Sequence, residues 1–321
     1  MIAVVIPYFQ RQPGVLRKAL RSIAAQRGCS LPVQVLVVDD ESPVPAEREV
    51  AGITWPAGME VTISHQPNAG PGGARNAGLD AVPSDCLYVA FLDSDDEWST
   101  DHLERAVAAL ELGYDFYFAD HLQLGQTVGA FGRANRLNMK QHPELISHHV
   151  GLHRFTGDFF DQILRGNVVG TSTVVYRWPT LKSERFKVEF TSAGEDYLFW
   201  MAAAKRKAKI AFSSNIAAVY GRGVNVYAGA GWGTEGHLKR LHDEIAYKKT
   251  VARLFELTDD QLSFVRSELS RLRLAFSRDL VHRLRHRMAI PTGLITAHWR
   301  IDSLTFWLLP ISIFRIILNR S

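Results

Sequence analysis

The chain has 321 residues, and 46% of them are hydrophobic, which is enough for one large α/β domain with an appended segment. Its two cysteines argue against a disulfide framework and against a cysteine-based zinc site, and they suit a reducing, cytoplasmic setting. A formal net charge of +4 gives no indication of a nucleic-acid partner, although it is compatible with anionic ligands or an anionic membrane surface.

The chain opens on an apolar, β-branched run, Ile2–Ile6, which predicts a central parallel strand buried on both faces. We expect Pro7, Tyr8 and Phe9 to end this strand. The first residues have neither the basic region nor the long apolar core of a signal peptide, which agrees with a cytoplasmic location.

The next two elements predict a strand–helix–strand unit. Apolar residues at helical spacing predict a helix over about Gly14–Gln26, and Val33–Val38 predicts a second strand. This order is typical of a doubly wound α/β sheet. Asp39 ends the second strand, where it can accept hydrogen bonds from a ribose or from a base N–H. It can equally be a loop or helix-capping carboxylate.

A glycine-rich stretch from Asn68 to Gly78 follows a third, shorter predicted strand at Val61–Ser64. Its glycines permit close backbone approach, and Arg75 offers a fork of donors suited to phosphate or to a nucleobase edge. A dinucleotide-binding fingerprint is the rival interpretation, but its glycines are spaced differently and follow the first strand. A plain glycine-rich helix start also fits the stretch.

The strand predicted over Tyr88–Leu92 ends in a group of carboxylates, Asp93, Asp95 and Asp96, with Glu97 directly after them. Open α/β sheets hold ligands at the carboxyl ends of their strands, and clustered carboxylates are tolerated when a cation neutralises them. Mg²⁺ and Mn²⁺ take oxygen ligands and share them with substrate phosphates. The alternative is an acidic turn that caps a helix expected over His102–Leu112.

The middle of the chain is less regular. Phe116–Ala119 predicts a further strand, and so does Val168–Tyr176, which would contain Thr171, Ser172 and Thr173. Several histidines lie between residues 125 and 154, but their spacing matches no metal-ligand pattern, so we interpret them as loop or surface residues. These are His142, His148, His149 and His153.

Two acidic residues, Glu195 and Asp196, precede an apolar helical run at Leu198–Ala204. Negative charge is favoured at a helix start, so both residues can serve as N-terminal capping groups. A carboxylate that faces a cleft can instead act as a general base toward an attacking hydroxyl. Ile210–Tyr220 predicts the last strand, and the glycine-rich residues 221–233 after it are long enough for a flap over a site.

From His237 onward the chain is predicted to be helical and basic, with arginines and leucines interleaved between Arg266 and Arg287. The segment Leu304–Leu318 is strongly apolar, but it is short for a membrane span and Pro310 interrupts it. A basic amphipathic region followed by an aromatic-rich apolar tail suits the interfacial plane of a membrane. A helical cap on the main domain or a dimer contact are the alternatives.

Taken together, five motifs in order resemble those of the family 2 inverting glycosyltransferases, over roughly residues 1–220. The motifs are Val4–Phe9, Val37–Asp40, Gly70–Gly78, Phe91–Asp96 and Gly194–Asp196. Three shorter stretches are similar to the bacterial glucosyltransferases that build succinoglycan-type exopolysaccharide, namely Pro43–Ala51, Gln66–Gly78 and Gly221–Asn225.

The resemblance implies the GT-A fold, a Rossmann-like, mixed and mostly parallel sheet flanked by helices, here with a helical C-terminal extension. It implies a nucleotide-sugar-binding half over residues 1–100, an acceptor-binding half over residues 101–235 and a basic, apolar extension over residues 236–321.

It also implies a role for each motif residue. Asp95 would bind the metal, Mg²⁺ or Mn²⁺, that bridges the donor's diphosphate, Asp196 would deprotonate the acceptor hydroxyl, and Glu195 would orient or bind the acceptor. Asp39 would face the uracil and Asp93 the ribose. The full set expected to bind the nucleotide sugar is Pro7, Tyr8, Asp39, Gly70, Arg75, Asn76, Asp93 and Ser94.

The expected reaction moves a hexose, glucose by this resemblance, from a UDP-sugar to a lipid-linked oligosaccharide in exopolysaccharide or other surface polysaccharide biosynthesis. The enzyme would lie on the inner face of the bacterial plasma membrane, bound through its C-terminal region, and would pair with a second copy of itself. One rival is a non-catalytic scaffold that binds sugar nucleotide or glycan. The other is a sugar-phosphate nucleotidyltransferase, whose usual glycine-rich signature after the first strand is replaced here by Tyr8–Arg11.

Overall fold

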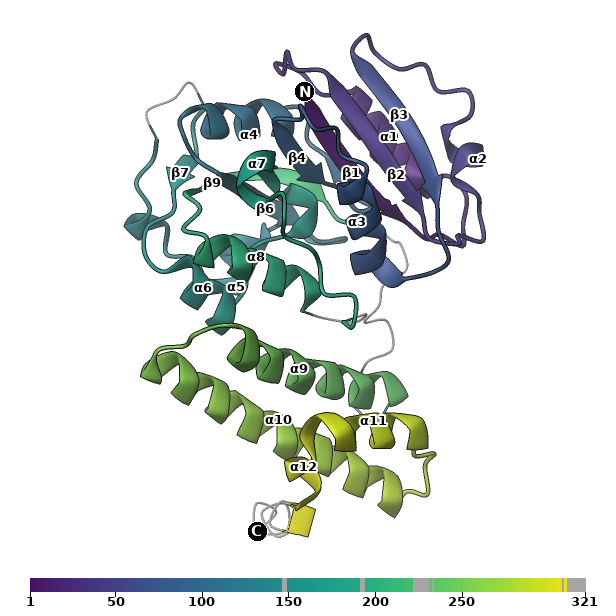
Figure 1. The fold of residues 1–321 in the computed structure, drawn as a ribbon, viewed down its shortest axis with the longest axis vertical. Coiled ribbons are helices and arrows are strands. Elements are labelled where there is room, and N and C mark those ends of the chain that lie inside the picture. The colour runs from purple at the N-terminus through teal and green to yellow at the C-terminus, as the bar shows by residue number, and fades with distance from the viewer. Residues whose placement is uncertain (146–148, 191–193, 222–230, 233, 308, 311–321) are drawn as a thin grey trace. The chain divides into compact units, whose positions relative to one another are not determined.

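A computed structural model describes residues 1–145, 149–190, 194–221, 231–232, 234–307 and 309–310 (Figure 1). The chain divides into two compact units. The sheet unit comprises residues 1–191 and 195–224, and the helical unit comprises residues 192–194 and 225–321. The two predicted halves, residues 1–100 and 101–235, contribute strands to one sheet, and this sheet belongs to the sheet unit.

One mixed sheet is the framework of the sheet unit. Its described strands are β1 (Ile2–Tyr8), β2 (Val33–Asp39), β3 (Met59–His65), β4 (Tyr88–Phe91), β5 (Glu97–Trp98), β6 (Phe116–Leu122), β7 (Leu152–Arg154), β8 (Val175–Arg177) and β9 (Ile210–Val219). They are ordered β3-β2-β1-β4-β8-β6-β9-β5, and β7 pairs with β9 outside that order. The neighbours β3, β2, β1 and β4 are parallel, as are β6 and β9, whereas β8 is antiparallel to β4 and β6.

Helices cover both faces of this sheet, because successive side chains of a strand point to opposite sides (Figure 1). The even-numbered residues of β1 are buried with α1 (Val15–Ala24) and α4 (His102–Glu111) on one face. On the other face, Phe91 and Phe116 pack against Trp200 of α8 (Glu195–Lys205), and Phe116 also packs against α6 (Phe159–Arg165). The predicted mixed sheet flanked by helices is confirmed.

Helix α3 (Gly70–Asp80) lies against β1 and β2 on the same face as α8. Its close approach requires Gly78, because a Cβ there would overlap Val5 Cγ1 and lie 3.4 Å from Val38 Cγ2. The glycine-rich stretch is therefore a helix start, as one of the sequence interpretations held, and it delivers Arg75 to the sheet. The remaining short elements are α2 (Ala46–Val50), α5 (Ala130–Ala134), α7 (Trp178–Leu181) and the 3₁₀ turns η1 (Met139–Gln141) and η2 (Thr171–Thr173).

The prediction of a strand over Val168–Tyr176 is wrong for most of that range. Residues Thr171–Thr173 form the 3₁₀ turn η2, and the strand β8 begins at Val175. The turn is held by the Gly170 carbonyl oxygen, which accepts hydrogen bonds from the Thr173 N–H at 2.9 Å and from Thr173 Oγ1 at 2.8 Å. Hydroxyl side chains offer the backbone such local partners in place of a sheet ladder, so the β-branched composition is misleading here.

The first strand also extends further than expected, since Pro7 and Tyr8 lie within β1 and pair with Val38 and Asp39. The ladder between β1 and β4 ends at Val5, so Pro7 has a strand neighbour on one side only. A proline is tolerated at such a position because its missing N–H removes no ladder hydrogen bond on the free side.

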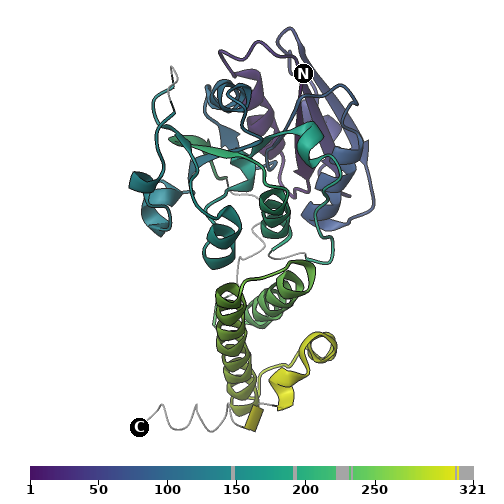
Figure 2. The same ribbon diagram turned by 60° about the vertical axis from the view of Figure 1, so that its left-hand side comes forward.

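The helical unit consists of α9 (Glu235–Leu254), α10 (Asp259–Arg285), α11 (Thr292–Asp302) and α12 (Leu304–Trp307). Helices α9 and α10 pack side by side (Figure 2) and bury apolar residues such as Ile245 and Phe276. Helix α10 begins with a capping box, in which Thr258 Oγ1 accepts from the Gln261 N–H and the Gln261 side chain accepts from the Thr258 N–H.

Several basic residues of this unit are used internally. Asp279 is fully buried and pairs with Arg283 at 2.8 Å and with His237 at 2.5 Å. Asp302 pairs in the same way with Arg273 at 2.7 Å and with Lys249 at 3.1 Å. The basic character read from the sequence is therefore partly structural and does not belong wholly to a surface.

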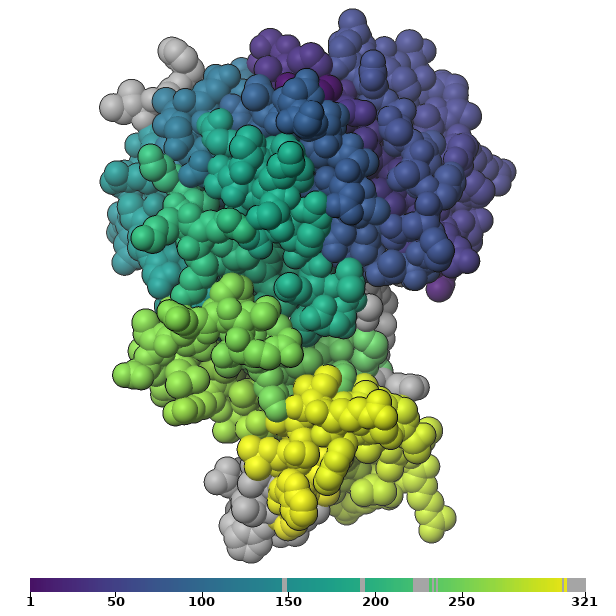
Figure 3. All heavy atoms as spheres, in the orientation of Figure 1, coloured from purple at the N-terminus to yellow at the C-terminus, as the bar shows by residue number. Residues whose placement is uncertain are grey.

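Helices α11 and α12, yellow in Figure 3, are on the surface in that view. They expose large apolar side chains, which include Trp299, Ile301, Leu304 and Trp307, the last with 72% of its surface accessible. Within the described residues, no helix is both long and apolar enough to cross a bilayer. Most of the predicted flap, residues 222–230 and 233, and most of the apolar tail, residues 308 and 311–318, lie outside the described residues, and so does His148.

Candidate active site

The carboxyl ends of β1, β2 and β4 meet at one edge of the sheet because these strands are parallel neighbours. Tyr8 and Asp39 are paired at the ends of β1 and β2, and Asp93 follows the end of β4 by two residues. In open α/β sheets a crevice forms beside the strand from which the connections run in opposite directions, here β1. Three segments that are distant in sequence thus bring their predicted ligand-binding residues to one place.

Pro7, Tyr8 and Asp39 lie at this edge, and the side chains of the last two are buried. The Tyr8 ring is fully buried in the core, and burial raises the pKa of Tyr8 to about 12. The Asp39 carboxylate is also buried and accepts hydrogen bonds from the Ser42 N–H at 2.7 Å and the Ala46 N–H at 2.9 Å. Asp39 therefore shapes the loop after β2, and its contact with a uracil stays a prediction.

The neighbouring Asp40 fixes the loop that leads into α3. One of its oxygens accepts from the Ala69 N–H at 2.8 Å and from Gln66 Nε2 at 2.6 Å, and the other accepts from the Gly70 N–H at 2.9 Å. These bonds satisfy N–H groups that a helix start leaves without an intrahelical partner. Gly70, with φ +74, gives the loop its turn, and this geometry positions the start of α3 at the crevice.

Asn76, another residue expected to bind the nucleotide sugar, holds a distant backbone segment. Its Nδ2 donates to the Phe186 carbonyl oxygen at 2.9 Å, and its Oδ1 accepts from the Phe186 N–H at 2.8 Å. The Phe186 ring in turn lies against Arg75, with the guanidinium carbon 5.3 Å from the ring centroid. Asn76 thus positions the Phe186 ring that contacts Arg75, and a contact between Asn76 and the nucleotide stays a prediction.

Arg75 is the centre of the charged groups in the crevice. Its guanidinium is buried and donates to Asp93 Oδ1 at 2.6 Å and to Glu195 Oε1 at 3.4 Å. Burial alone would lower the pKa of Arg75, but the two carboxylates outweigh it and raise that pKa above its ordinary value. Arg75 therefore stays charged. It joins the loop after β4 that contains Asp93, Asp95 and Asp96, here called the acidic loop, to the start of α8.

Replacing Arg75 by methionine should destabilise the fold by about 3 kcal/mol at neutral pH, because it leaves the Glu195 and Asp93 carboxylates without their buried cation. We expect the low end of the range for broken buried pairs, since 32% of the Asp93 side chain is accessible to solvent. Chemical denaturation would measure the change. Arg185→Met, which breaks an exposed pair with Asp80, is the matched control and should cost at most about 1 kcal/mol. Equal losses in both variants would contradict this account of the cluster.

The acidic loop after β4 is tied to the turn η2 through Ser172, a residue that no sequence motif singles out. Ser172 Oγ accepts from the Asp93 N–H at 3.0 Å and donates to Asp96 Oδ2 at 2.5 Å, while the Ser172 carbonyl oxygen accepts from Trp98 Nε1 at 2.5 Å. Ser94 is buried and is held by Gln10 Nε2 at 3.1 Å. These bonds fix the backbone from which Asp93 and Asp95 project.

The three aspartates of this loop have the donor chemistry that a hard divalent cation requires. Burial, and after it the charges of Asp93 and Asp95, raise the pKa of Asp96 to about 8, which records the repulsion within the group. Asp96 is buried and accepts from the Gly221 N–H at 3.0 Å, whereas Asp95 is half-buried. Among the described residues, no three His, Cys, Asp or Glu side chains form a complete metal cage. Mg²⁺ needs none where one or two carboxylates share it with substrate phosphates, so the loop fits such an ion.

Asp196 stands in the first turn of α8 beside the Arg75 cluster. One of its oxygens accepts from the N–H of the next residue, Tyr197, at 2.8 Å, and the other accepts from Thr171 Oγ1 at 3.3 Å. Burial and the charge of Glu195 raise the pKa of Asp196 to about 7, although Arg75 opposes the shift. A carboxyl group with this pKa can take up a proton near neutrality, which is the property of a general base.

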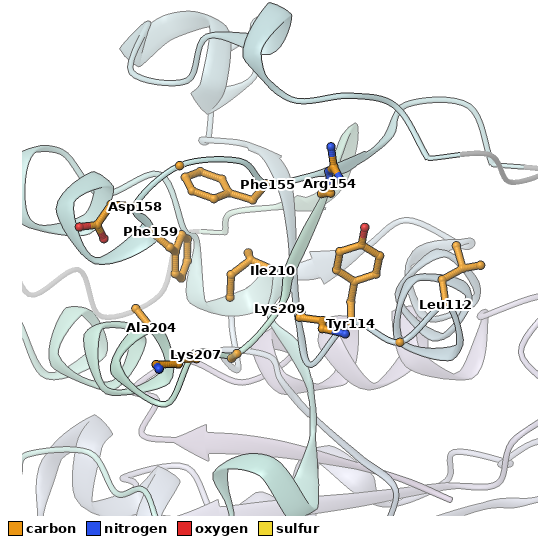
Figure 4. Close-up of a pocket in the computed structure, with 13 residues that line it drawn as sticks. Leu112, Tyr114, Arg154, Phe155, Asp158, Phe159, Ala204, Lys207, Lys209 and Ile210 are labelled. Carbon is orange, nitrogen blue, oxygen red and sulfur yellow. The ribbon is translucent and has the colours of Figure 1, made fainter.

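The described structure also contains a separate pocket of about 580 Å³, near the start of β6 and β9 (Figure 4). Its walls include Tyr114, Phe155 and Phe159, and the basic residues Arg154, Lys207 and Lys209 lie among its lining. None of the residues that the sequence predicted for catalysis or nucleotide binding lines it. Of the histidines between residues 125 and 154, His142 stacks on Phe155 and His153 stacks on Phe212.

Comparison with known proteins agrees with the motifs. Residues 3–175 match the model of the family described as Glycosyl transferase family 2. The succinoglycan biosynthesis protein ExoW of Rhizobium meliloti is 35% identical over 228 residues, which cover 70% of this chain and 70% of that protein. The GalNAc(5)-diNAcBac-PP-undecaprenol beta-1,3-glucosyltransferase of Campylobacter jejuni is 25% identical over 207 residues, or 64% of this chain and 60% of that protein.

Two solved structures share the fold. Residues 1–349 of TarS from S. aureus superpose with a TM-score of 0.54 at 18% identity, and the match covers 88% of this chain and 72% of that one. The mannosyltransferase PcManGT from Pyrobaculum calidifontis, solved in complex with GDP-Man and Mn²⁺, gives a TM-score of 0.57 at 14% identity over 100% of this chain and 88% of that one.

Proposed function

Because this chain belongs to glycosyltransferase family 2 and has the GT-A fold, we propose that it transfers a hexose from a UDP-sugar to a lipid-linked oligosaccharide with inversion at the anomeric carbon. The observation that carries the proposal is the position of Asp196. A carboxyl group with a pKa raised to about 7 lies next to Arg75, which is itself bonded to the Asp93 of the acidic loop. Arg75 thereby joins the loop proposed to bind the diphosphate to Glu195, the neighbour of the proposed base.

The donor would bind at the carboxyl ends of β1, β2 and β4. We assign the uridine to the side of Asp39, the ribose to Asp93, and the remaining donor contacts to Pro7, Tyr8, Gly70, Arg75, Asn76 and Ser94. Since the Tyr8 ring is fully buried, Tyr8 would contact the nucleotide through its backbone. Glucose is the hexose we propose, because ExoW acts in succinoglycan biosynthesis and the Campylobacter relative is named a glucosyltransferase.

Asp95 would hold a divalent cation, Mg²⁺ or Mn²⁺, together with the donor's diphosphate. Such an ion supplies neutralisation of the charge that develops on the departing nucleoside diphosphate. The PcManGT complex with Mn²⁺ supports a metal in this fold. The chain's own contribution is to hold Asp95 on a fixed loop. On one side of this loop Ser172 Oγ accepts from the Asp93 N–H, and next to Asp95 the Ser94 hydroxyl accepts from Gln10 Nε2.

On the acceptor side, Asp196 would take the proton of the attacking hydroxyl, and Glu195 would bind or orient the acceptor beside it. Thr171 donates to one Asp196 oxygen, which aims the carboxylate and leaves lone pairs for the substrate hydroxyl. The lipid-linked nature of the acceptor is proposed from the undecaprenol-linked substrate named for the Campylobacter relative. Exopolysaccharide synthesis is proposed as the setting because of ExoW.

The first test is release of UDP from a panel of UDP-sugars, with Mn²⁺, Mg²⁺ or EDTA, in the presence of a membrane lipid extract as acceptor source. We expect metal-dependent release from one donor, UDP-glucose. Binding of a donor without turnover under any condition would favour the non-catalytic scaffold. Formation of pyrophosphate from UTP and a sugar phosphate would favour a nucleotidyltransferase.

The pH dependence of transfer should report Asp196. A base works when it is unprotonated, so kcat/KM should be low in acid and rise through about pH 7, the value to which burial raises the pKa of Asp196. Glu195→Gln removes a negative neighbour and leaves the opposing Arg75 in place, so it should lower that pKa and move the midpoint of the rise to lower pH. Rate profiles between about pH 5 and 9 measure the midpoint. A midpoint that stays or moves upward in Glu195→Gln would show that another group controls the rise.

We further propose that the protein binds the inner face of the plasma membrane through the helical unit. Trp299 and Trp307 are exposed and lie near one another, with ring centroids 6.3 Å apart, and indole rings favour the membrane interface. Replacing both by serine should release most of the protein from anionic lipid vesicles in a sedimentation assay. Leu112→Ser, at an exposed leucine of the sheet unit, should have no effect. Unchanged sedimentation of the double variant would count against this surface.

The proposed pairing with a second copy would be measured by light scattering.

A further inference from the structure

Two aromatic rings stack beside the start of the turn η2. Tyr220 directly follows β9, His121 is near the end of β6, and their ring centroids are 4.2 Å apart with an interplanar angle of 14°. The backbone of Tyr220 is fixed, because its N–H donates to the Leu122 carbonyl oxygen at 2.8 Å. The β6–β9 ladder has a register shift on each side of Asp120, and such bulges re-aim side chains next to active sites.

The hydrogen-bonding groups of both rings are unused within the described part of the chain. His121 is 7% exposed, and its Nδ1 has no partner there. Burial lowers the pKa of His121 to about 4, so the imidazole is neutral at physiological pH. Tyr220 is half-buried, and no described residue forms a hydrogen bond with its Oη. Buried polar groups are almost always paired, so the unpartnered His121 Nδ1 requires an explanation.

Both groups point toward Gly170. A Cβ at this residue would lie 2.5 Å from Tyr220 Oη and 2.7 Å from His121 Nδ1, so only glycine leaves room for the two rings. Gly170 immediately precedes Thr171, whose hydroxyl donates to Asp196. Burial, and after it the charges of Asp96, Asp93 and Asp196, raise the pKa of Tyr220. The Tyr220 hydroxyl is therefore within electrostatic range of the acidic loop and of the base.

From this geometry we infer that Tyr220 binds a hydroxyl of the acceptor sugar next to the one that Asp196 deprotonates, and that His121 is the positioning residue that holds the Tyr220 ring. This inference rests on the proposed function. A phenol can both donate and accept one hydrogen bond, as a sugar hydroxyl does. The neutral imidazole supports the ring face without adding a charge to a site that already contains several.

The acceptor is favoured over the donor because of where these residues originate. The groups assigned to the nucleotide lie at the carboxyl ends of β1 and β2, follow β4 or belong to α3. By contrast, Tyr220 follows β9, His121 lies in β6 and Gly170 precedes η2. In an inverting displacement the attacking hydroxyl approaches opposite the departing diphosphate. Residues beside Asp196 that come from the second half of the sheet therefore belong to the attacking side.

Tyr220→Phe, which removes one oxygen and keeps the ring stack, tests the inference. With UDP-glucose as donor and a detergent-solubilised membrane lipid extract titrated as acceptor, the half-saturating amount of extract should rise about tenfold, as expected for one hydrogen bond to a substrate. The KM for UDP-glucose and the slow hydrolysis of UDP-glucose without acceptor should not change. Tyr176→Phe is the matched control, since the Tyr176 hydroxyl has no partner in the described core and lies among Phe91 and Phe199, away from the proposed site. It should leave every parameter unchanged.

The variants of His121 separate support of the ring from hydrogen bonding. His121→Phe preserves a stacking ring and should stay within about twofold of the wild type, whereas His121→Ala should raise the half-saturating amount of extract at least as much as Tyr220→Phe. An active wild type with an unchanged acceptor requirement in Tyr220→Phe would overturn the inference alone. A rise in the donor KM of Tyr220→Phe without a rise for the acceptor would overturn it as well, and would assign the hydroxyl to the donor. A wild type that neither binds nor turns over any UDP-sugar would overturn the proposed function and this inference with it.

Discussion

Asp196→Asn is expected to reduce transfer by about 10²- to 10⁴-fold, the range over which a positioned general base contributes. The substitution keeps the size of the side chain and one oxygen, which can still accept from the Tyr197 N–H, while the new amide NH₂ takes the place of the oxygen that accepts from Thr171 Oγ1. It removes the ability to take up a proton. The KM for the UDP-sugar should change little, because the donor is assigned to other residues. Initial rates of UDP release with saturating acceptor measure the effect.

This variant also decides between catalysis and helix capping, which the sequence left open for Asp196. If the carboxylate were only a capping group, asparagine would replace it well and activity would persist. Asp158→Asn is the control, because Asp158 caps α6 by accepting from the Asp161 N–H at 3.0 Å, on a helix that carries none of the proposed site residues. We expect both variants to unfold near the wild-type temperature and only Asp196→Asn to lose transfer. Nearly full activity of Asp196→Asn would remove it from the role of base.

Loss of the divalent cation is expected to have an effect of similar size. Neutralisation of a departing diphosphate contributes several kcal/mol, and each 1.36 kcal/mol is tenfold in rate, so EDTA should lower transfer by at least about 10²-fold. Excess Mg²⁺ or Mn²⁺ should restore it. Asp95→Ala should imitate chelation and should raise the metal concentration needed for half-maximal activity.

The adjacent carboxylate of Glu97 is the natural control for Asp95. Glu97 is the first residue of β5, two residues after Asp95, and it is exposed. Glu97→Gln should therefore keep the wild-type metal requirement. If Glu97→Gln loses activity and Asp95→Ala retains it, the metal ligand has been assigned to the wrong residue. If neither chelation nor Asp95→Ala has an effect, the acidic loop serves another purpose, such as holding Arg75 through Asp93.

Much of the framework could be predicted because its signals are local. The mostly apolar runs of β1, β2 and β4 indicate buried strands, and the acidic residues that come after β2 and β4 mark strand ends. The helix start at Glu195 was also visible, since two acids precede an apolar run. In each of these cases a few neighbouring residues determine the structure, so a pattern within one window is sufficient.

The connections between these elements could not be predicted, because they depend on residues far apart in the chain. Arg75 and Glu195 are 120 positions apart, and Ser172 is 76 positions from the Asp96 it binds. The same holds for Asn76, whose residue type suits a ligand contact but whose amide binds the Phe186 backbone. A polar side chain in a glycine-rich stretch satisfies either role equally well, and only the fold shows which partner is present.

The turn η2 imposes a limit on how enzymes of this type can be recombined. Its Thr171 holds Asp196 while its Ser172 holds Asp93 and Asp96, so one short segment contacts both the proposed donor side and the proposed acceptor side. A chimera that exchanges acceptor preference between relatives should therefore place its crossover outside residues 170–173 and should take Tyr220 and His121 from the same parent. A crossover within the turn would separate partners that have been matched in each parent, and would cost activity toward every donor and acceptor.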